Sequence, residues 1–289
     1  MNRARAMWGL LEPIHVVTYF APEARATADA LGMRGFWMGY AAQRSAPLGA
    51  VGPEIATAAF FGFHPDRLGR ALPDAWHLTT PEAALAARLA GAGAALRRLW
   101  GDHVVDAPAT AEAAELAWQA AAGAECAGRV LAAANQVLPR PREPHLALWQ
   151  AATTLREHRG DGHIAVLVAR GVAPVASHLI KAAAGESDPE VLRTGRKFAE
   201  PAWAAGAAAL RADGVLTADG QLTAAGRRLH AEIEDATDAA AAPPWHAVGD
   251  AATARLADLL SPLAAAVLDS GTLPQPNPVG FVPSMTITR

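Results

Sequence analysis

The chain has 289 residues, of which 52% are hydrophobic and 18% charged, and its formal net charge is −3. This composition is far from that of a disordered chain, and the charge offers no overall attraction to nucleic acid or to an anionic membrane. The one cysteine, Cys126, excludes an intramolecular disulfide and a metal cage of cysteines. Because the sequence shows no signal-peptide core and no run of about 18 uncharged apolar residues, we expect a cytoplasmic protein.

Helical patterns fill the first half of the sequence. Apolar residues recur at near-helical spacing over 4–20, and a second helix is predicted from Pro22. Thr80 is a predicted N-cap of a long Ala/Leu helix over 81–100, and a similar pattern covers 110–138. Alanine dominates these segments and is a strong helix former. We therefore expect the first half to be helical throughout.

The proline-rich run 139–144 is the clearest break in the pattern. A chain of this length exceeds the usual size of one hydrophobic core, which favours two packed lobes. We place the boundary at this run, with an N-terminal helical domain over 1–140 and a second domain over 141–289.

In the second half, helical patterns appear near 175–184, over 200–212 and from Ala224 onward. Residues 214–223 differ, because two short apolar dipeptides flank Asp219-Gly220, the strongest hairpin signal in the chain. The predicted fold class is therefore mainly α, with two helical lobes, the second a winged-helix-like domain with a small β-hairpin wing.

Several segments carry a resemblance to known families. Three helices followed by 210–216, the hairpin and 222–226 resemble a winged-helix domain of the MarR type over about residues 145–240. The whole chain further resembles an uncharacterised actinobacterial helical family with a degenerate form of that domain, through the segments 62–65, 158–163 and 233–238. The resemblance implies a helix-turn-helix fold for the second half and brings no activity with it.

DNA binding is the weaker expectation for this domain. In a working winged helix, the helix before the hairpin reads base edges and the wing contacts phosphate. Here 200–213 offers one arginine, and 217–221 offers an acid and no base. The cations Arg193, Arg196 and Lys197 precede the helix and are candidates for phosphate contacts. The structural alternative is an Ala/Trp helix packed against the first lobe.

Residues 156–163 read Arg-Glu-His-Arg-Gly-Asp-Gly-His and form the densest ionisable run in the chain. As structure alone, Gly160 ends one helix and Asp161 caps the next. As an acid–base site, Asp161 orients an imidazole while His158 or His163 transfers protons, which makes these three the candidate catalytic residues. As a metal site the spacing is poor, because the two histidines are five apart across a glycine, so no metal is predicted.

Further candidates belong to the first half. Glu12 and His15 lie three residues apart on one helix face. They are interpreted either as a functional His–Glu couple or as a hydrogen-bonded pair in the core. Tyr40 and Arg44 are one helical turn apart, where a guanidinium suits a carboxylate or a phosphate group, or else covers the ring at the surface. The predicted ligand-binding set comprises Glu12, His15, Trp37, Tyr40, Arg44, His64, Arg156 and Trp203.

The sequence contains no phosphate-binding loop, no nucleophile elbow and no His-Glu-x-x-His motif. We predict a small-molecule-binding protein with a pocket between two helical lobes, and an enzyme using His/Asp/Glu acid–base chemistry as its sharper version. The alternative is a MarR-like, ligand-responsive transcriptional regulator that binds DNA through the winged helix. A partner-binding module comes third. The patterns name no cofactor, no membrane partner and no oligomeric state.

Overall fold

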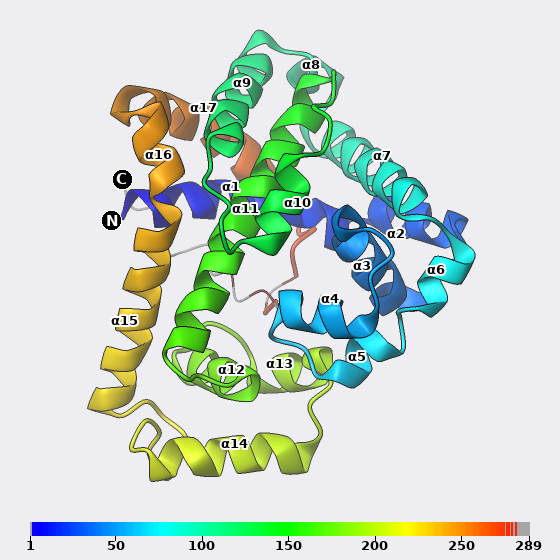
Figure 1. Cartoon of the computed structure of the whole chain (residues 1–289). Helices are drawn as coiled ribbons and strands as arrows, with labels where there is room; N and C mark the ends of the chain where they lie inside the picture. The colour runs from blue at the N-terminus through cyan, green and yellow to red at the C-terminus, as the bar shows by residue number, and fades with distance from the viewer. Residues whose placement is uncertain (1, 275, 278, 280, 282–289) are drawn as a thin grey trace.

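The computed structural model describes residues 2–274, 276, 277, 279 and 281, and Figure 1 shows its course. Up to residue 136 the elements are α1 (Arg3–Phe20), α2 (Pro22–Ala30), α3 (Gly35–Ser45), the 3-10 helix η1 (Ala46–Leu48), α4 (Pro53–Phe60), α5 (Pro65–Gly69), α6 (Asp74–Leu78), α7 (Pro81–Trp100), α8 (Asp102–Val105), α9 (Pro108–Ala122) and α10 (Val130–Gln136). The remaining elements are α11 (Pro144–Ala169), α12 (Pro174–Ala183), α13 (Pro189–Arg196), α14 (Glu200–Ala212), α15 (Ala224–Ala241), α16 (Pro243–Val248) and α17 (Asp250–Asp269).

Helix α11 is the central element of the fold (Figure 1). Its first half packs against α1, α9 and α10, and α15 packs along it further down. The main hydrophobic core surrounds its first half and includes Leu148 and Trp149, both without exposed surface. Beyond its end the chain forms α12, α13 and α14, and α15 then leads back to α16 and α17, which pack against α9. Both halves of the chain therefore meet along α11.

The predicted end of a helix at Gly160 is wrong, because α11 continues through it to Ala169. A glycine inside a helix costs only about 1 kcal/mol relative to alanine, and packing along the whole helix outweighs that cost. The second glycine, Gly162, leaves room for a neighbour, since a Cβ there would lie 2.5 Å from Nη1 of Arg129. Asp161 consequently lies inside α11, and no helix begins next to it for it to cap.

Two predictions for the first half have different outcomes. The Thr80 cap is confirmed, because its hydroxyl accepts a hydrogen bond from the amide of Ala83 at 3.2 Å. The single helical pattern over 110–138 is instead two helices, α9 and α10, separated by 123–129. Gly128 in this connection has φ of 72°, a left-handed conformation that a continuous helix does not contain.

The predicted β-hairpin wing is wrong: the described residues contain no β-strand. Residues 214–223 form a turn with one isolated antiparallel bridge, between Leu216 and Leu222. The arms are too short to extend it, because Thr223 already caps α15 by accepting from the amide of Gly226 at 3.0 Å. The first turn of α15 also lies close against the first arm of the turn, since a Cβ on Gly226 would lie 2.2 Å from the carbonyl oxygen of Val215. The all-helical class stands without a wing.

A separate core holds α12–α14 together. Trp203 and Leu210 of α14 pack there with Leu179 of α12 and Leu192 of α13. Because only this face of α14 is covered, Ala204, Ala205 and Ala208 on its other side are exposed. Helix α14 packs against α12, at the far end of the molecule from α8 and α9 (Figure 1). The expected packing of this helix against the first lobe is thus replaced by packing against α12 and α13. Helices α12–α14 are called the helix-turn-helix part below.

The last helix, α17, has the length and hydropathy of a membrane span. It is the only single helix in the described part of the chain with both properties. Its apolar stripe, however, is buried in the main core through Leu256, Leu260 and Leu263. That core draws residues from both sides of the Pro-rich run at 139–144, and the division of the chain into 1–140 and 141–289 stays a prediction.

Candidate functional site

A pocket of about 170 Å³ lies where α11 passes between the helix-turn-helix part and the first helices. Helices α3, α11, α12, α13 and α15 and the turn after α4 each contribute to its wall. Its apolar lining comprises Phe60, Phe61, Ile164, Leu167, Ile180 and Ile233, with Val279 from the C-terminal segment. Its polar lining comprises Tyr40, Arg44, Arg156, His163, Ser177, His178, Lys181, Glu186, Arg196, His230 and Glu234. The pocket therefore combines an apolar wall with many ionisable groups.

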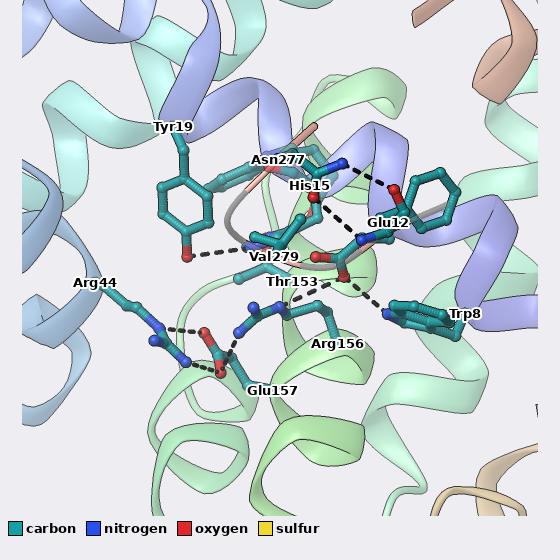
Figure 2. Close-up of polar contacts among 12 residues, drawn as sticks. Trp8, Glu12, His15, Tyr19, Arg44, Thr153, Arg156, Glu157, Asn277 and Val279 are labelled. Carbon is teal, nitrogen blue, oxygen red and sulfur yellow. Dashed lines mark hydrogen bonds and ion pairs between the residues drawn. The ribbon is translucent and has the colours of Figure 1, made fainter. Parts of the chain in front are cut away.

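Two arginines at one end share a buried carboxylate. Nε and Nη2 of Arg44 each donate to Glu157 at 3.0 Å, and Nη1 of Arg156 donates to the same carboxylate at 3.0 Å (Figure 2). Nε of Arg156 also lies 3.5 Å from Glu12, which accepts a hydrogen bond from the indole of Trp8. Burial by itself raises the pKa of Glu157, but the two guanidiniums outweigh it and hold that pKa below its ordinary value. Glu157 is therefore ionised in the folded protein.

Arg196 of α13 reaches the same end of the pocket. Its guanidinium lies 4.2 Å from the ring centroid of Phe63, a cation–π distance. Burial lowers the pKa of Arg196, Tyr40 opposes this, and the charges of Arg44 and Arg156 lower it further. Three guanidiniums thus approach one another here, one from each of α3, α11 and α13.

The other end of the pocket holds histidines and a carboxylate. Nδ1 of His163 lies 2.9 Å from the hydroxyl of Thr237, and Nε2 of His178 donates to the carbonyl of Gly62 at 2.7 Å. Burial lowers the pKa of His163 to about 4 and that of His178 to about 3, so both are neutral at pH 7. The hydrogen bond from His230 to Glu186, at 2.8 Å, raises the pKa of His230 instead.

The three predicted catalytic residues do not face a common space. On a continuous helix, five residues turn through about 500°, which leaves His158 and His163 about 140° apart. His163 lines the pocket, whereas Nε2 of His158 donates to the carbonyl of Glu125 at 3.1 Å, in the connection before α10. Burial, together with the charge of Arg129, lowers the pKa of His158 to about 4. An acid–base pair of these two histidines therefore has no geometric basis.

Asp161 caps a helix distant in sequence. Its Oδ2 accepts from the amide of Ala132 at 2.9 Å, in the first turn of α10. Burial raises the pKa of Asp161 to about 6, and the backbone hydrogen bond from Ala132 limits the rise. The carboxylate thus satisfies an amide that α10 itself leaves without a partner.

We expect Asp161→Ala to lower the free energy of unfolding by about 0.5–2 kcal/mol, because it removes the cap of α10. Asp161→Asn is the matched control, since it keeps an acceptor oxygen and should remain close to the wild type. Urea unfolding followed by circular dichroism measures both variants. An alanine variant as stable as the asparagine variant would show that the hydrogen bond to Ala132 contributes nothing.

The predicted ligand-binding residues divide into three groups. Tyr40, Arg44 and Arg156 line the pocket with His163. Glu12 and His15 do not pair: Glu12 contacts Arg156, whereas the ring of His15 lies 3.0 Å from Thr153 and 3.2 Å from Tyr19 (Figure 2). Their place is in the buried core behind the pocket, and any ligand role for them stays a prediction.

The remaining members of that set lie elsewhere. Trp37 packs edge-on against Tyr40 and lies under the guanidinium of Arg67. His64 is half-exposed and accepts from the amide of Asp66 at the start of α5. Trp203 is buried in the core of the helix-turn-helix part. None of the three lines the pocket.

Sequence reasoning missed most of the second-half residues in the wall. Glu157 stands inside the ionisable run that the sequence singles out, and Phe60 and Phe61 precede the aromatic segment at 62–65. No local signal in the sequence connects these segments with the other wall residues, which come from three helices and one loop: His178, Lys181, Glu186, Arg196, His230, Ile233 and Glu234.

In the described part of the chain, no group of three or more His, Cys, Asp or Glu residues is placed to hold a metal ion. A model of a helix-turn-helix family matches residues 4–274. No curated protein and no solved structure matches the chain.

Proposed function

This chain belongs to a helix-turn-helix family, and on that premise we propose that it binds a small molecule in the pocket beside α11. The helix-turn-helix part forms much of the wall, through His178 and Lys181 of α12 and Arg196 of α13. The backbone carbonyl of Arg196 also accepts from the amide of His64 in the first half, at 3.0 Å. A molecule in the pocket would therefore contact both halves and bias how the helix-turn-helix part is held.

Gly160 is the observation that carries this proposal. It lies inside a 26-residue helix, where alanine is more stable by about 1 kcal/mol, and it lines the pocket. Packing does not require it: an added Cβ would lie 3.6 Å from Glu157 and 3.9 Å from Arg156, ordinary contact distances. Gly162 differs, because Arg129 occupies the space beside it. The missing side chain at 160 therefore preserves open space in the pocket.

A panel of small organic acids, amides and alcohols tests ligand binding by ligand-detected NMR. We expect at least one compound to bind the wild type and to lose binding in Gly160→Leu, because the new side chain fills the pocket. The matched control is Val168→Leu on the same helix, where the side chain is 63% exposed, and it should bind as the wild type does. A panel without a binder, or binders that Gly160→Leu leaves unchanged, would refute a ligand function for the pocket.

DNA binding is the second candidate, which the family and the exposed outer face of α14 both favour. That face presents alanines, and Arg211 is the one cation of the helix. Exposed Arg227 and Arg228 at the start of α15 add charges suited to phosphate. Alanines donate no hydrogen bonds to base edges, so this surface favours contacts with the DNA backbone over sequence readout.

We therefore expect salt-sensitive DNA binding with little sequence preference. Fluorescence anisotropy should show similar affinities for a duplex from the upstream region of the protein's own gene and for a scrambled duplex. Both affinities should fall steeply between about 50 mM and about 200 mM salt, because phosphate contacts release counterions. Tight, selective retention of the upstream duplex at the higher salt would contradict this expectation and establish a sequence-specific regulator.

A further inference from the structure

The hydrogen bonds of His163 fix which of its ring nitrogens carries the proton. Nδ1 of His163 lies 2.9 Å from the hydroxyl oxygen of Thr237, and that oxygen lies 2.8 Å from the carbonyl oxygen of Ile233. A threonine hydroxyl has one hydrogen, and here it is donated to the carbonyl oxygen, which can only accept. The hydroxyl of Thr237 therefore accepts from Nδ1–H of His163. In the neutral imidazole, Nε2 is then an unprotonated acceptor.

Nε2 of His163 has no hydrogen-bond partner within the part of the chain that the structure describes. The imidazole lines the pocket and is partly exposed, whereas His178 is buried, with 8% of its surface exposed. The pKa of about 4 that burial gives His163 leaves Nε2 unprotonated at neutral pH. A ligand that covers this nitrogen has to supply a donor, because an unpaired acceptor costs free energy once water is excluded.

A charged donor is disfavoured at this position. Burial is the main cause of the lowered pKa of His163, since a charge is poorly solvated there, and the charge of Lys181 adds to it. An ammonium group of a ligand beside the ring would meet the same two obstacles. The donor that suits Nε2 is therefore uncharged.

The rest of the pocket selects the body of the ligand. Phe61, Ile164, Leu167 and Ile233 form an apolar wall that offers no partner for further polar groups. A hydroxyl is a small group that donates one hydrogen bond. A cavity of about 150 Å³ accommodates benzene in another protein, and this pocket measures about 170 Å³. One small ring, or an aliphatic group of similar size, with one hydroxyl therefore fits.

Resting on the proposed function, in which the pocket binds a small molecule, we propose that its ligand is a small uncharged hydroxyl compound, a phenol or an alcohol, that donates to Nε2 of His163. Its compact apolar body lies against Ile164 and Ile233. Such a ligand satisfies the acceptor and covers the apolar wall.

Proton–nitrogen correlation spectra of the histidine rings test the acceptor in the wild type. His163 should show a protonated Nδ1 and an unprotonated Nε2. Added phenol should shift the Nε2 resonance of His163, and it should leave the ring of the exposed His103 unchanged. A proton on Nε2 of His163, or an Nε2 resonance that saturating phenol does not move, would overturn the proposal.

Isothermal titration calorimetry with phenol, fluorobenzene and benzoate tests the ligand class. Fluorobenzene has the same ring as phenol and nearly the same size, but it cannot donate a hydrogen bond. The ratio of the affinity for phenol to the affinity for fluorobenzene should fall about tenfold or more in His163→Leu, because the phenol hydroxyl loses its acceptor. His163→Gln keeps an acceptor and should recover part of this ratio. His103→Gln, at an exposed position, is the matched control and should leave the ratio unchanged.

Continued binding of fluorobenzene to His163→Leu shows that the pocket of this variant is intact, and the spectra of the wild type decide the matter if the variant does not fold. An unchanged ratio in a folded His163→Leu, or benzoate that binds the wild type more tightly than phenol, overturns the hydroxyl assignment. In those cases the proposed function survives if a compound of the panel still loses binding in Gly160→Leu. A panel without any binder overturns both.

Discussion

Glu157→Gln should lower the free energy of unfolding by about 3–5 kcal/mol, the usual cost of removing one partner from a buried ion pair. Glu157 has 1% of its surface exposed and accepts hydrogen bonds from both Arg44 and Arg156. Glutamine keeps the shape but not the charge, so two buried guanidiniums lose the anion that they share. Because these arginines also line the pocket, the same variant should lower the affinity for any ligand bound there.

Urea unfolding of the wild type and of Glu157→Gln measures the effect. The control is Glu112→Gln, which removes the partner of Arg255 from an exposed ion pair and should unfold as the wild type does. Equal stability of Glu157→Gln and the wild type would mean that the arginines do not depend on this carboxylate. The account of Glu157 as the anion that holds Arg44 and Arg156 in the wall of the pocket would then fail.

The protein should also lose stability steeply as the pH falls from about 6.5 to about 4. Burial lowers the pKa of His158 and His163 to about 4 and of His178 to about 3. In this range the unfolded chain binds protons at these three imidazoles and the folded chain does not. Their stabilising contribution is therefore complete above pH 6.5 and is lost as the pH falls towards the folded values. His15, whose pKa burial also lowers, acts in the same direction.

Asp161 acts in the opposite direction. Its pKa of about 6 in the folded state exceeds the ordinary value of 3.8, so folding takes up a proton there between these two values. The three imidazoles His158, His163 and His178 against one carboxyl leave a net difference of two protons, to which His15 adds. The free energy of unfolding should therefore fall by at least about 2.7 kcal/mol per pH unit near pH 5.

Urea unfolding at intervals between pH 4 and pH 7 measures this slope. His163→Asn should reduce it by about one proton, because the variant loses one buried imidazole. His103→Gln, at an exposed position, serves as the control and should leave it unchanged. A stability that stays constant over this range would contradict the burial of neutral histidines.

The helical class and several helix starts follow from local sequence. Thr80 before Pro81 starts α7 as expected, and Pro22 starts α2. Such signals work because capping and proline geometry involve only a few neighbouring residues. The same locality explains the wrong hairpin: Asp219-Gly220 does form a turn, but the strand length depends on how soon α15 begins.

Only the tertiary structure decided how the ionisable run at 156–163 is used. The sequence by itself placed Arg156, Asp161 and both histidines together, and it interpreted Gly160 as a helix end. Packing along α11 keeps that helix continuous, so its rotation sends His163 into the pocket and His158 towards the start of α10. The pocket itself unites elements more than 100 residues apart, and its combination of charged and apolar groups becomes apparent only when their side chains are placed together. Local patterns determine secondary structure within a few residues, whereas a binding site depends on contacts between distant parts of the chain.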